Sequence, residues 1–139
     1  MTHIKFYVTR SEDTLSRLLV ACKLTQKALQ HQMQVYIHVD SASMAEQLGA
    51  LLWEFSDESF IAHEIAPSEC NVNVLLGYNY EPMINCDYLI NLTDECPEFF
   101  ARYLQLAEII SQDISVLEGG RERYRFYKDR GYKLDYYKL

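Results

Sequence analysis

The sequence lacks the short motifs that mark most enzymes and metal proteins. It contains no GxxxxGK[ST] loop, no GxSxG elbow, no HExxH pair and no CxxC pair. Its four cysteines and four histidines are dispersed along the chain, so their spacing predicts no metal site. We therefore expect no cofactor, no small-molecule substrate and no catalytic constellation.

Long hydrophobic runs and glycine-rich loops are also missing. No stretch approaches the roughly 20 consecutive apolar residues that a membrane-spanning helix needs, and the N-terminus lacks the apolar run of a secretion signal. The first predicted strand-to-helix turn, Thr9–Asp13, holds no glycine and two carboxylates, although nucleotide-binding sheets need glycine there for close approach to phosphate. These absences predict a cytoplasmic protein with no membrane partner and no P-loop.

What the sequence does contain is an alternation of β-prone apolar runs with helix-like periodicities. The predicted strands are Ile4–Val8, Val35–Val39, Val72–Leu76, Tyr88–Leu92 and Glu108–Ile110, the last of which we expect to be the final strand. Helices are predicted at about 12–31, with Ser11 as N-cap and an acidic first turn, and at about 43–52, 96–104 and 113–131. This alternation predicts one domain over residues 1–139, a Rossmann-like three-layer α/β sandwich with a mainly parallel sheet.

Charge is distributed unevenly along the chain, whose formal net charge is −7. Residues 121–139 contain seven Lys or Arg against three Asp or Glu, whereas the other 120 residues contain six basic and 17 acidic side chains. The chain is thus an acidic body of net charge −11 with a basic end of net charge +4. The overall negative charge argues against binding nucleic acid with the whole surface.

The basic end carries the most informative pattern. On a helix, Arg121, Tyr124, Arg125 and Lys128 stand at i, i+3, i+4 and i+7, so three cations and one aromatic ring share one face. Such a face suits a partner that brings an aromatic side chain together with carboxylates. It also suits single-stranded nucleic acid, whose bases stack on tyrosine. A solvated basic helix face without a ligand is the third interpretation.

Two segments resemble the chi subunits of bacterial DNA polymerase III. Trp53 followed by Glu58–His63 is similar to the tryptophan-to-histidine segment of that family, and Arg121–Arg125 with Tyr127 and Gly131 is similar to its C-terminal RERY-x-x-Y helix. The order and separation of the two motifs, together with the overall length, extend the resemblance over nearly the whole chain.

The resemblance implies an adaptor that performs no catalysis in the polymerase assembly. Members of the family pair with the psi subunit and bind the acidic C-terminal tail of single-stranded DNA-binding protein, so DNA is reached only indirectly. Carried over by motif, the psi-facing residues are Trp53 and Phe60. The residues implied for the tail site are Arg121, Tyr124 and Arg125. Lys128 is a weaker addition, made because it shares their helix face.

Two other functions remain as alternatives to the adaptor. The first is direct binding of single-stranded nucleic acid through the basic, aromatic C-terminal helix, against which the acidic body argues. The second is an enzyme on a degenerate nucleotide-binding fold, against which the missing motifs argue.

Overall fold

The computed structural model describes residues 1–54, 61–67, 72–83 and 87–139. All seven strands of this part of the chain belong to one parallel sheet, with the order β3-β4-β2-β5-β6-β1-β7. The strands are β1 (His3–Val8), β2 (Val35–His38), β3 (Glu64–Ile65), β4 (Val74–Gly77), β5 (Tyr88–Asn91), β6 (Gln105–Ile110) and β7 (Lys133–Lys138). The helices are α1 (Thr14–Gln30), α2 (Ala42–Glu54), the short 3₁₀ helix η1 (Phe100–Arg102) and α3 (Ile114–Asp129).

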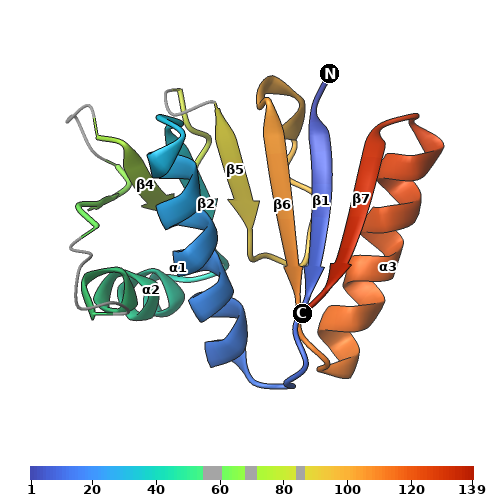
Figure 1. Cartoon of the computed structure of the whole chain (residues 1–139), viewed down its shortest axis with the longest axis horizontal. Helices are drawn as coiled ribbons and strands as arrows, with labels where there is room; N and C mark the ends of the chain where they lie inside the picture. The colour runs from blue at the N-terminus through green and yellow to red at the C-terminus, as the bar shows by residue number, and fades with distance from the viewer. Residues whose placement is uncertain (55–60, 68–71, 84–86) are drawn as a thin grey trace.

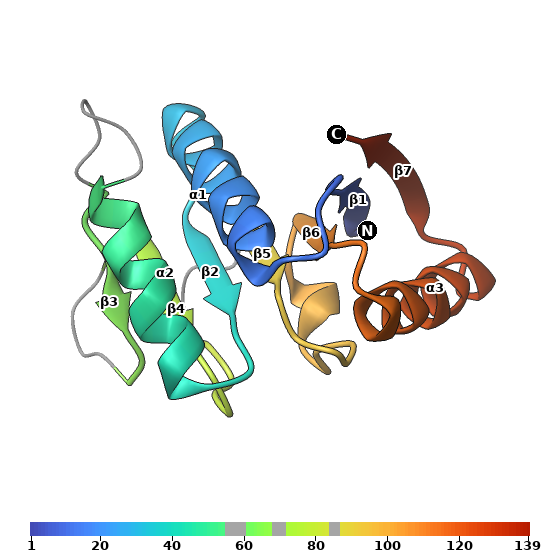
Figure 2. The ribbon, with the colours of Figure 1, turned by 90° about the horizontal axis from the view of Figure 1, so that it is seen from below.

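The helices cover both faces of the sheet, which gives the three layers predicted from the sequence. Figure 2 shows α1 and α2 on one face and α3 on the other. One apolar core lies under α1 and α2, and a second, richer in aromatic residues, lies between the sheet and α3. The central strands β2, β4 and β5 are buried on both faces, as expected for a parallel sheet enclosed by helices. The Rossmann-like fold is confirmed.

The sequence prediction was wrong about the last strand. Glu108–Ile110 belongs to β6, and β7 follows α3 and pairs with β1 in parallel, from His3 beside Lys133 to Val8 beside Lys138. In β7 the apolar and polar residues alternate: Leu134 and Tyr136 lie on the α3 side, in register with Ile4 and Phe6. β7 therefore adds an edge strand that brings the C-terminal residues beside the N-terminal ones, as Figure 1 shows.

The predicted helix over 96–104 is reduced to the single turn η1. Tyr103 N–H donates to the carbonyl of Phe100, three residues back, and β6 already begins at Gln105. The segment before this turn is held by side chains instead of helical bonds: the Asn91 amide and the Thr93 hydroxyl both donate to the carbonyl of Glu95. The backbone bonds from Pro97 to Tyr103 are of the i→i−3 type, as in a 3₁₀ turn and not an α-helix.

The first and last helices form where they were predicted, but α1 begins later than expected: its N-cap is Asp13 and not Ser11, and its first turn holds no acidic residue. Asp13 caps α1 by accepting from the backbone N–H of Ser16 at 2.8 Å, and Asp113 caps α3 by accepting from that of Val116 at 3.3 Å. Gly120, which weakens α3 by propensity, lets the helix lie directly on β6. A Cβ at this position would stand 2.7 Å from Cδ1 of Ile110, so the close approach requires glycine.

Candidate functional site

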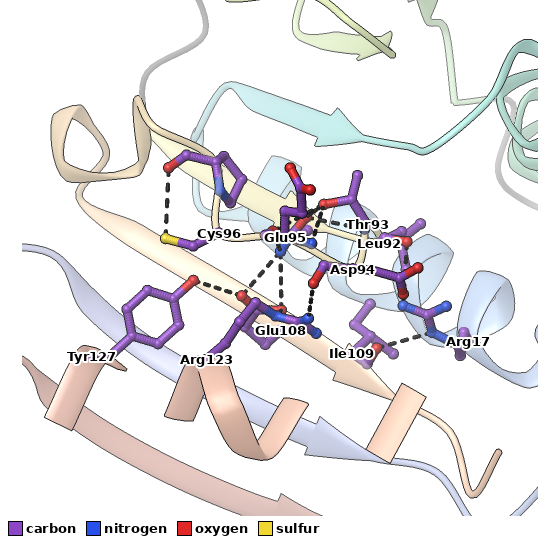
Figure 3. Close-up of polar contacts among 12 residues, drawn as sticks. Arg17, Leu92, Thr93, Asp94, Glu95, Cys96, Glu108, Ile109, Arg123 and Tyr127 are labelled. Atoms are coloured by element: carbon purple, nitrogen blue, oxygen red, sulfur yellow. Dashed lines mark hydrogen bonds and ion pairs between the residues drawn. The ribbon is translucent and has the colours of Figure 1, made fainter. Parts of the chain in front are cut away.

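A buried polar network fixes the position of α3 on the sheet (Figure 3). Arg123 on α3 donates from Nε to Oε1 of Glu108 on β6 at 3.1 Å, and the Tyr127 hydroxyl donates to Oε2 at 2.7 Å. The amide of Asn91 on β5 completes the carboxylate's partners at 3.0–3.2 Å. Arg123 also donates from a terminal guanidinium nitrogen to the carbonyl of Asp94 at 2.7 Å. The rotation of α3 is thereby set by contacts to two strands and a loop.

Glu108 is fully buried, and its burial raises the pKa of the carboxyl while Arg123, Tyr127 and Asn91 oppose that rise. Removing one partner from such a pair costs about 3–5 kcal/mol, because a buried charge is left uncompensated. The network therefore has a structural role: it orients the opposite face of α3.

The opposite face of α3 carries the four residues that the sequence predicted to share one helix face. Arg121, Arg125 and Lys128 are exposed, and Tyr124 is half-buried with its ring edge-on to Phe6 at 5.3 Å between centroids. The prediction that these four share a face with Tyr124 at the border of the core thus agrees with the structure. They do not all meet at one hollow, however.

A hollow of about 540 Å³ lies where the carboxyl ends of β1 and β7 meet the first half of α3. Of the four predicted residues only Arg121 lines it. Its other cations are Arg10, which follows β1, and Lys138, at the end of β7, while Val8, Leu117 and Tyr136 supply apolar surface. No Asp or Glu is among the described residues that line this hollow. We call it the basic hollow.

Backbone and side-chain bonds hold the rim of the basic hollow in place. Arg10 donates from Nε to the carbonyl of Leu139 at 2.7 Å, and Leu139 N–H donates to the carbonyl of Val8 at 2.9 Å. The Gln112 amide donates to the carbonyl of Thr9 at 2.8 Å. These bonds join the loop between β1 and α1, the segment before α3 and the end of β7. The three cations of the hollow therefore come from three different segments.

Sequence reasoning missed Arg10, Tyr136 and Lys138 because it missed β7. The alternation of Leu134 and Tyr136 with polar residues was the available signal. Arg125 and Lys128 follow Arg121 by one and two turns of α3, which places them along the helix from the hollow at about 5 Å per turn. They extend the cationic surface from the hollow along α3.

The second predicted surface is described only in part. Trp53 is the next-to-last residue of α2; its side chain is 46 % exposed, and its ring centroid lies 5.6 Å from that of His63. Nearly half of the Trp53 side chain is thus accessible to a partner. Phe60 lies outside the described residues.

A second hollow, of about 550 Å³, lies at the carboxyl ends of β2, β4 and β5. Its lining includes Asp40, Glu81, Asp94, Glu95 and Glu98, so we call it the acidic hollow. A metal needs three or more convergent ligands, and no such group of His, Cys, Asp or Glu occurs among residues 1–54, 61–67, 72–83 and 87–139.

His38 is the histidine at the acidic hollow. The Tyr36 hydroxyl lies 3.1 Å from its Nδ1, and the ring of Phe99 lies edge-on to it at 5.3 Å. Burial lowers the pKa of His38.

No helix in the described part of the chain is long and apolar enough to cross a bilayer.

Taken together, fold and site define a Rossmann-like α/β domain with a basic, partly apolar hollow at one sheet edge. A family model described as "DNA polymerase III chi subunit, HolC" matches residues 1–135. The chain therefore belongs to the family of DNA polymerase III chi subunits, which are accessory subunits of that polymerase.

Individual relatives agree with this assignment. The chain is 37 % identical to the DNA polymerase III subunit chi of Pseudomonas aeruginosa over 139 residues, covering all of this chain and 98 % of the relative. The corresponding subunit of Haemophilus influenzae is 25 % identical, with 94 % of this chain and 92 % of the relative covered. Among solved structures, a DEAD-box helicase domain 2 of Mss116p bound to an RNA duplex is similar in fold alone, with a TM-score of 0.63 at 13 % identity. That match covers 96 % of this chain and 64 % of the solved one.

Proposed function

We propose that this chain is a non-catalytic adaptor that binds the acidic C-terminal tail of single-stranded DNA-binding protein in the basic hollow. The same chain would bind the psi subunit through the surface around Trp53 and Phe60. The adaptor would thus link the clamp loader to coated single-stranded DNA.

The observation that carries this proposal is the combination of charge and apolar surface in one hollow. Arg10, Arg121 and Lys138 supply three cations, and guanidinium groups bind carboxylates in a fork. Leu117 and Tyr136 supply apolar surface for an aromatic ring. A volume of about 540 Å³ is within the usual size of a ligand site, so the end of a peptide can be accommodated with its ring and its carboxylates engaged together.

The two hollows differ in charge, and this difference favours the basic hollow for an acidic peptide. The acidic hollow has about the same volume, but its five carboxylates would repel an acidic peptide. Arg125 and Lys128 lie farther along α3, where they would contact residues preceding the end of the tail. We therefore expect the contributions of Arg121, Arg125 and Lys128 to binding to decrease in that order.

The test is calorimetric titration of the full chain with a short acidic peptide that ends in phenylalanine. Arg121→Ala is expected to weaken binding by about 1–3 kcal/mol, the scale of a lost charge-assisted contact, and Arg125→Ala and Lys128→Ala to weaken it progressively less. Arg102→Ala is the matched control, because Arg102 is an exposed arginine paired with Glu81 beside the acidic hollow. Unchanged affinity in Arg121→Ala would overturn the site.

The psi surface is tested separately. Trp53→Ala is expected to weaken the complex with the psi subunit while leaving the affinity for the acidic peptide intact, because Trp53 lies at the end of α2, far in the fold from β7. Tyr78→Ala is the control, since Tyr78 has similar exposure on another loop. If Trp53→Ala lowers both affinities together with the melting temperature, the residue has a structural role instead.

A further inference from the structure

One face of the β1–β7 edge has no helix over it among the described elements. Figure 2 shows α1 on the side of the sheet away from α3, over β2 and β5, with β1 and β7 beyond it. On this side β1 presents Lys5 and Tyr7, because Ile4 and Phe6 point into the core under α3. The register places Asp135 and Tyr137 of β7 beside them. We call this surface the open face.

Two tyrosine rings dominate the open face. Tyr7 and Tyr137 stack with their centroids 5.2 Å apart and their planes inclined by 20°. Tyr137 is 42 % exposed, so the pair offers a flat aromatic surface to solvent. Exposed, pre-oriented rings on a sheet can stack with nucleobases at little cost in side-chain entropy.

A cavity of about 170 Å³ adjoins this pair, between β1 and the second half of α1. Lys5 and Tyr7 line it from the sheet, and Lys27 and His31 line it from the end of α1. No carboxylate is among the described residues that line it. Cationic groups therefore surround an aromatic-walled cavity that is continuous with the open face.

The charge of the surrounding segments favours a polyanion here. α1 contains no Asp or Glu but includes Lys23 and Lys27. The acid of β7, Asp135, lies 2.6 Å from Nε2 of His3, which satisfies it locally. The strongly acidic part of the chain is residues 35–120, with 15 Asp or Glu and one Lys or Arg, whereas residues 1–34 hold five basic and two acidic side chains.

The geometry points to the open face as a second binding surface, for single-stranded nucleic acid. A base stacks on the Tyr137 ring, which Tyr7 supports from its other face, and phosphates lie against Lys5, Lys27 and Lys133. The surface is distinct from the basic hollow: Tyr136 and Lys138 point to the α3 side of β7, whereas Tyr137 points to the other side. The adaptor thereby gains a direct contact with the strand in addition to the indirect one expected from the sequence.

The experiment measures fluorescence anisotropy of a labelled oligothymidine titrated with the full chain at several salt concentrations. Three lysines on phosphates predict a slope of log affinity against log salt of about −2, since each contact with a single strand contributes about −0.7. Lys5→Gln is expected to reduce that slope by about one third. Tyr137→Ala is expected to weaken binding about tenfold, through lost stacking, and Tyr137→Phe to keep the wild-type affinity.

Two sets of controls distinguish binding at the open face from binding at the basic hollow and from non-specific electrostatic attraction of polyanions. Tyr78→Ala removes a tyrosine of similar exposure elsewhere and should leave oligothymidine binding unchanged. Arg121→Ala should leave it unchanged too, although that variant is expected to bind the acidic peptide more weakly. Inorganic polyphosphate should compete poorly because it has no bases. The inference is overturned if oligothymidine does not bind, if Tyr137→Ala binds like wild type, or if Arg121→Ala is the variant that loses it.

Discussion

The two hollows at the carboxyl edge of the sheet are nearly equal in volume and opposite in charge. The basic hollow, of about 540 Å³, is built by β1, β7 and α3, from the two ends of the chain. The acidic hollow, of about 550 Å³, follows β2, β4 and β5, from its middle. Shape and fold are therefore poor guides to what each hollow binds. The charge that each segment brings decides it.

Basic and acidic side chains are separated more sharply in space than along the chain. Residues 1–34 and 121–139 together carry 12 basic and five acidic side chains, and residues 35–120 carry one basic and 15 acidic side chains. Parallel pairing of β7 with β1 joins the two basic ends at one edge. The molecule thus has a basic side that suits anionic partners and an acidic side that repels them.

The strongest way to break this arrangement is to remove the contact that joins its two sides. Arg123 comes from the basic C-terminal segment and Glu108 from the acidic middle, and the pair is buried. Arg123→Ala is expected to lower the free energy of unfolding by about 3–5 kcal/mol, because Glu108 is left buried and unpaired. Chemical denaturation followed by circular dichroism measures it.

A double variant serves as the control. Arg123→Met combined with Glu108→Leu removes both charges and should recover much of the lost stability. A double variant as unstable as Arg123→Ala would show that packing, and not the unpaired charge, causes the loss.

The next largest effect is expected from reversing charge in the basic hollow. Arg121→Glu should weaken binding of the acidic peptide at least 100-fold, because it removes an attraction and adds a repulsion at one place. Calorimetric titration measures it. Glu98→Lys in the acidic hollow is the mirror variant, and it should leave peptide affinity close to wild type. If Glu98→Lys raises the peptide affinity by more than Arg121→Glu lowers it, the peptide binds in the acidic hollow instead.

A smaller effect should follow from the contact between α3 and β6. Gly120→Ala places a methyl group against Ile110 and is expected to cost about 1–3 kcal/mol of unfolding free energy. Ile110→Val removes Cδ1, the atom in closest contact, so adding it to Gly120→Ala should restore part of the loss. Thermal unfolding of the single and double variants measures this. If the double variant is no more stable than Gly120→Ala, the steric explanation is contradicted.

The smallest expected effect is a dependence on pH at the acidic hollow. Burial lowers the pKa of His38 in the folded state, so the unfolded chain binds a proton there more readily as pH falls below about 6.5. Stability is then lost on acidification, by at most about 1.4 kcal/mol per pH unit for one proton. His38→Gln should reduce the slope of unfolding free energy between pH 7 and pH 5, and an unchanged slope would contradict this origin.

Prediction from the sequence succeeded where the signal was local. The runs at Val35–Val39 and Tyr88–Leu92 gave two of the strands, and the pattern from about Asp113 to Gly131 gave α3 with its exposed cationic face. It failed where a short segment depends on a distant partner. β7 forms because β1 offers an edge to pair with, and no residue near Lys133 encodes that partner.

The sequence by itself determined the class of fold, the exposed cationic face of α3 and, through its two motifs, membership of the chi family. Tertiary structure alone decided that Arg10 and Lys138 join Arg121 around one hollow, and that Tyr7 stacks on Tyr137 across the open face. The physical reason is that helix periodicity and strand composition act over a few residues. Binding surfaces at a sheet edge, by contrast, are assembled by pairing between strands about 130 residues apart in the chain.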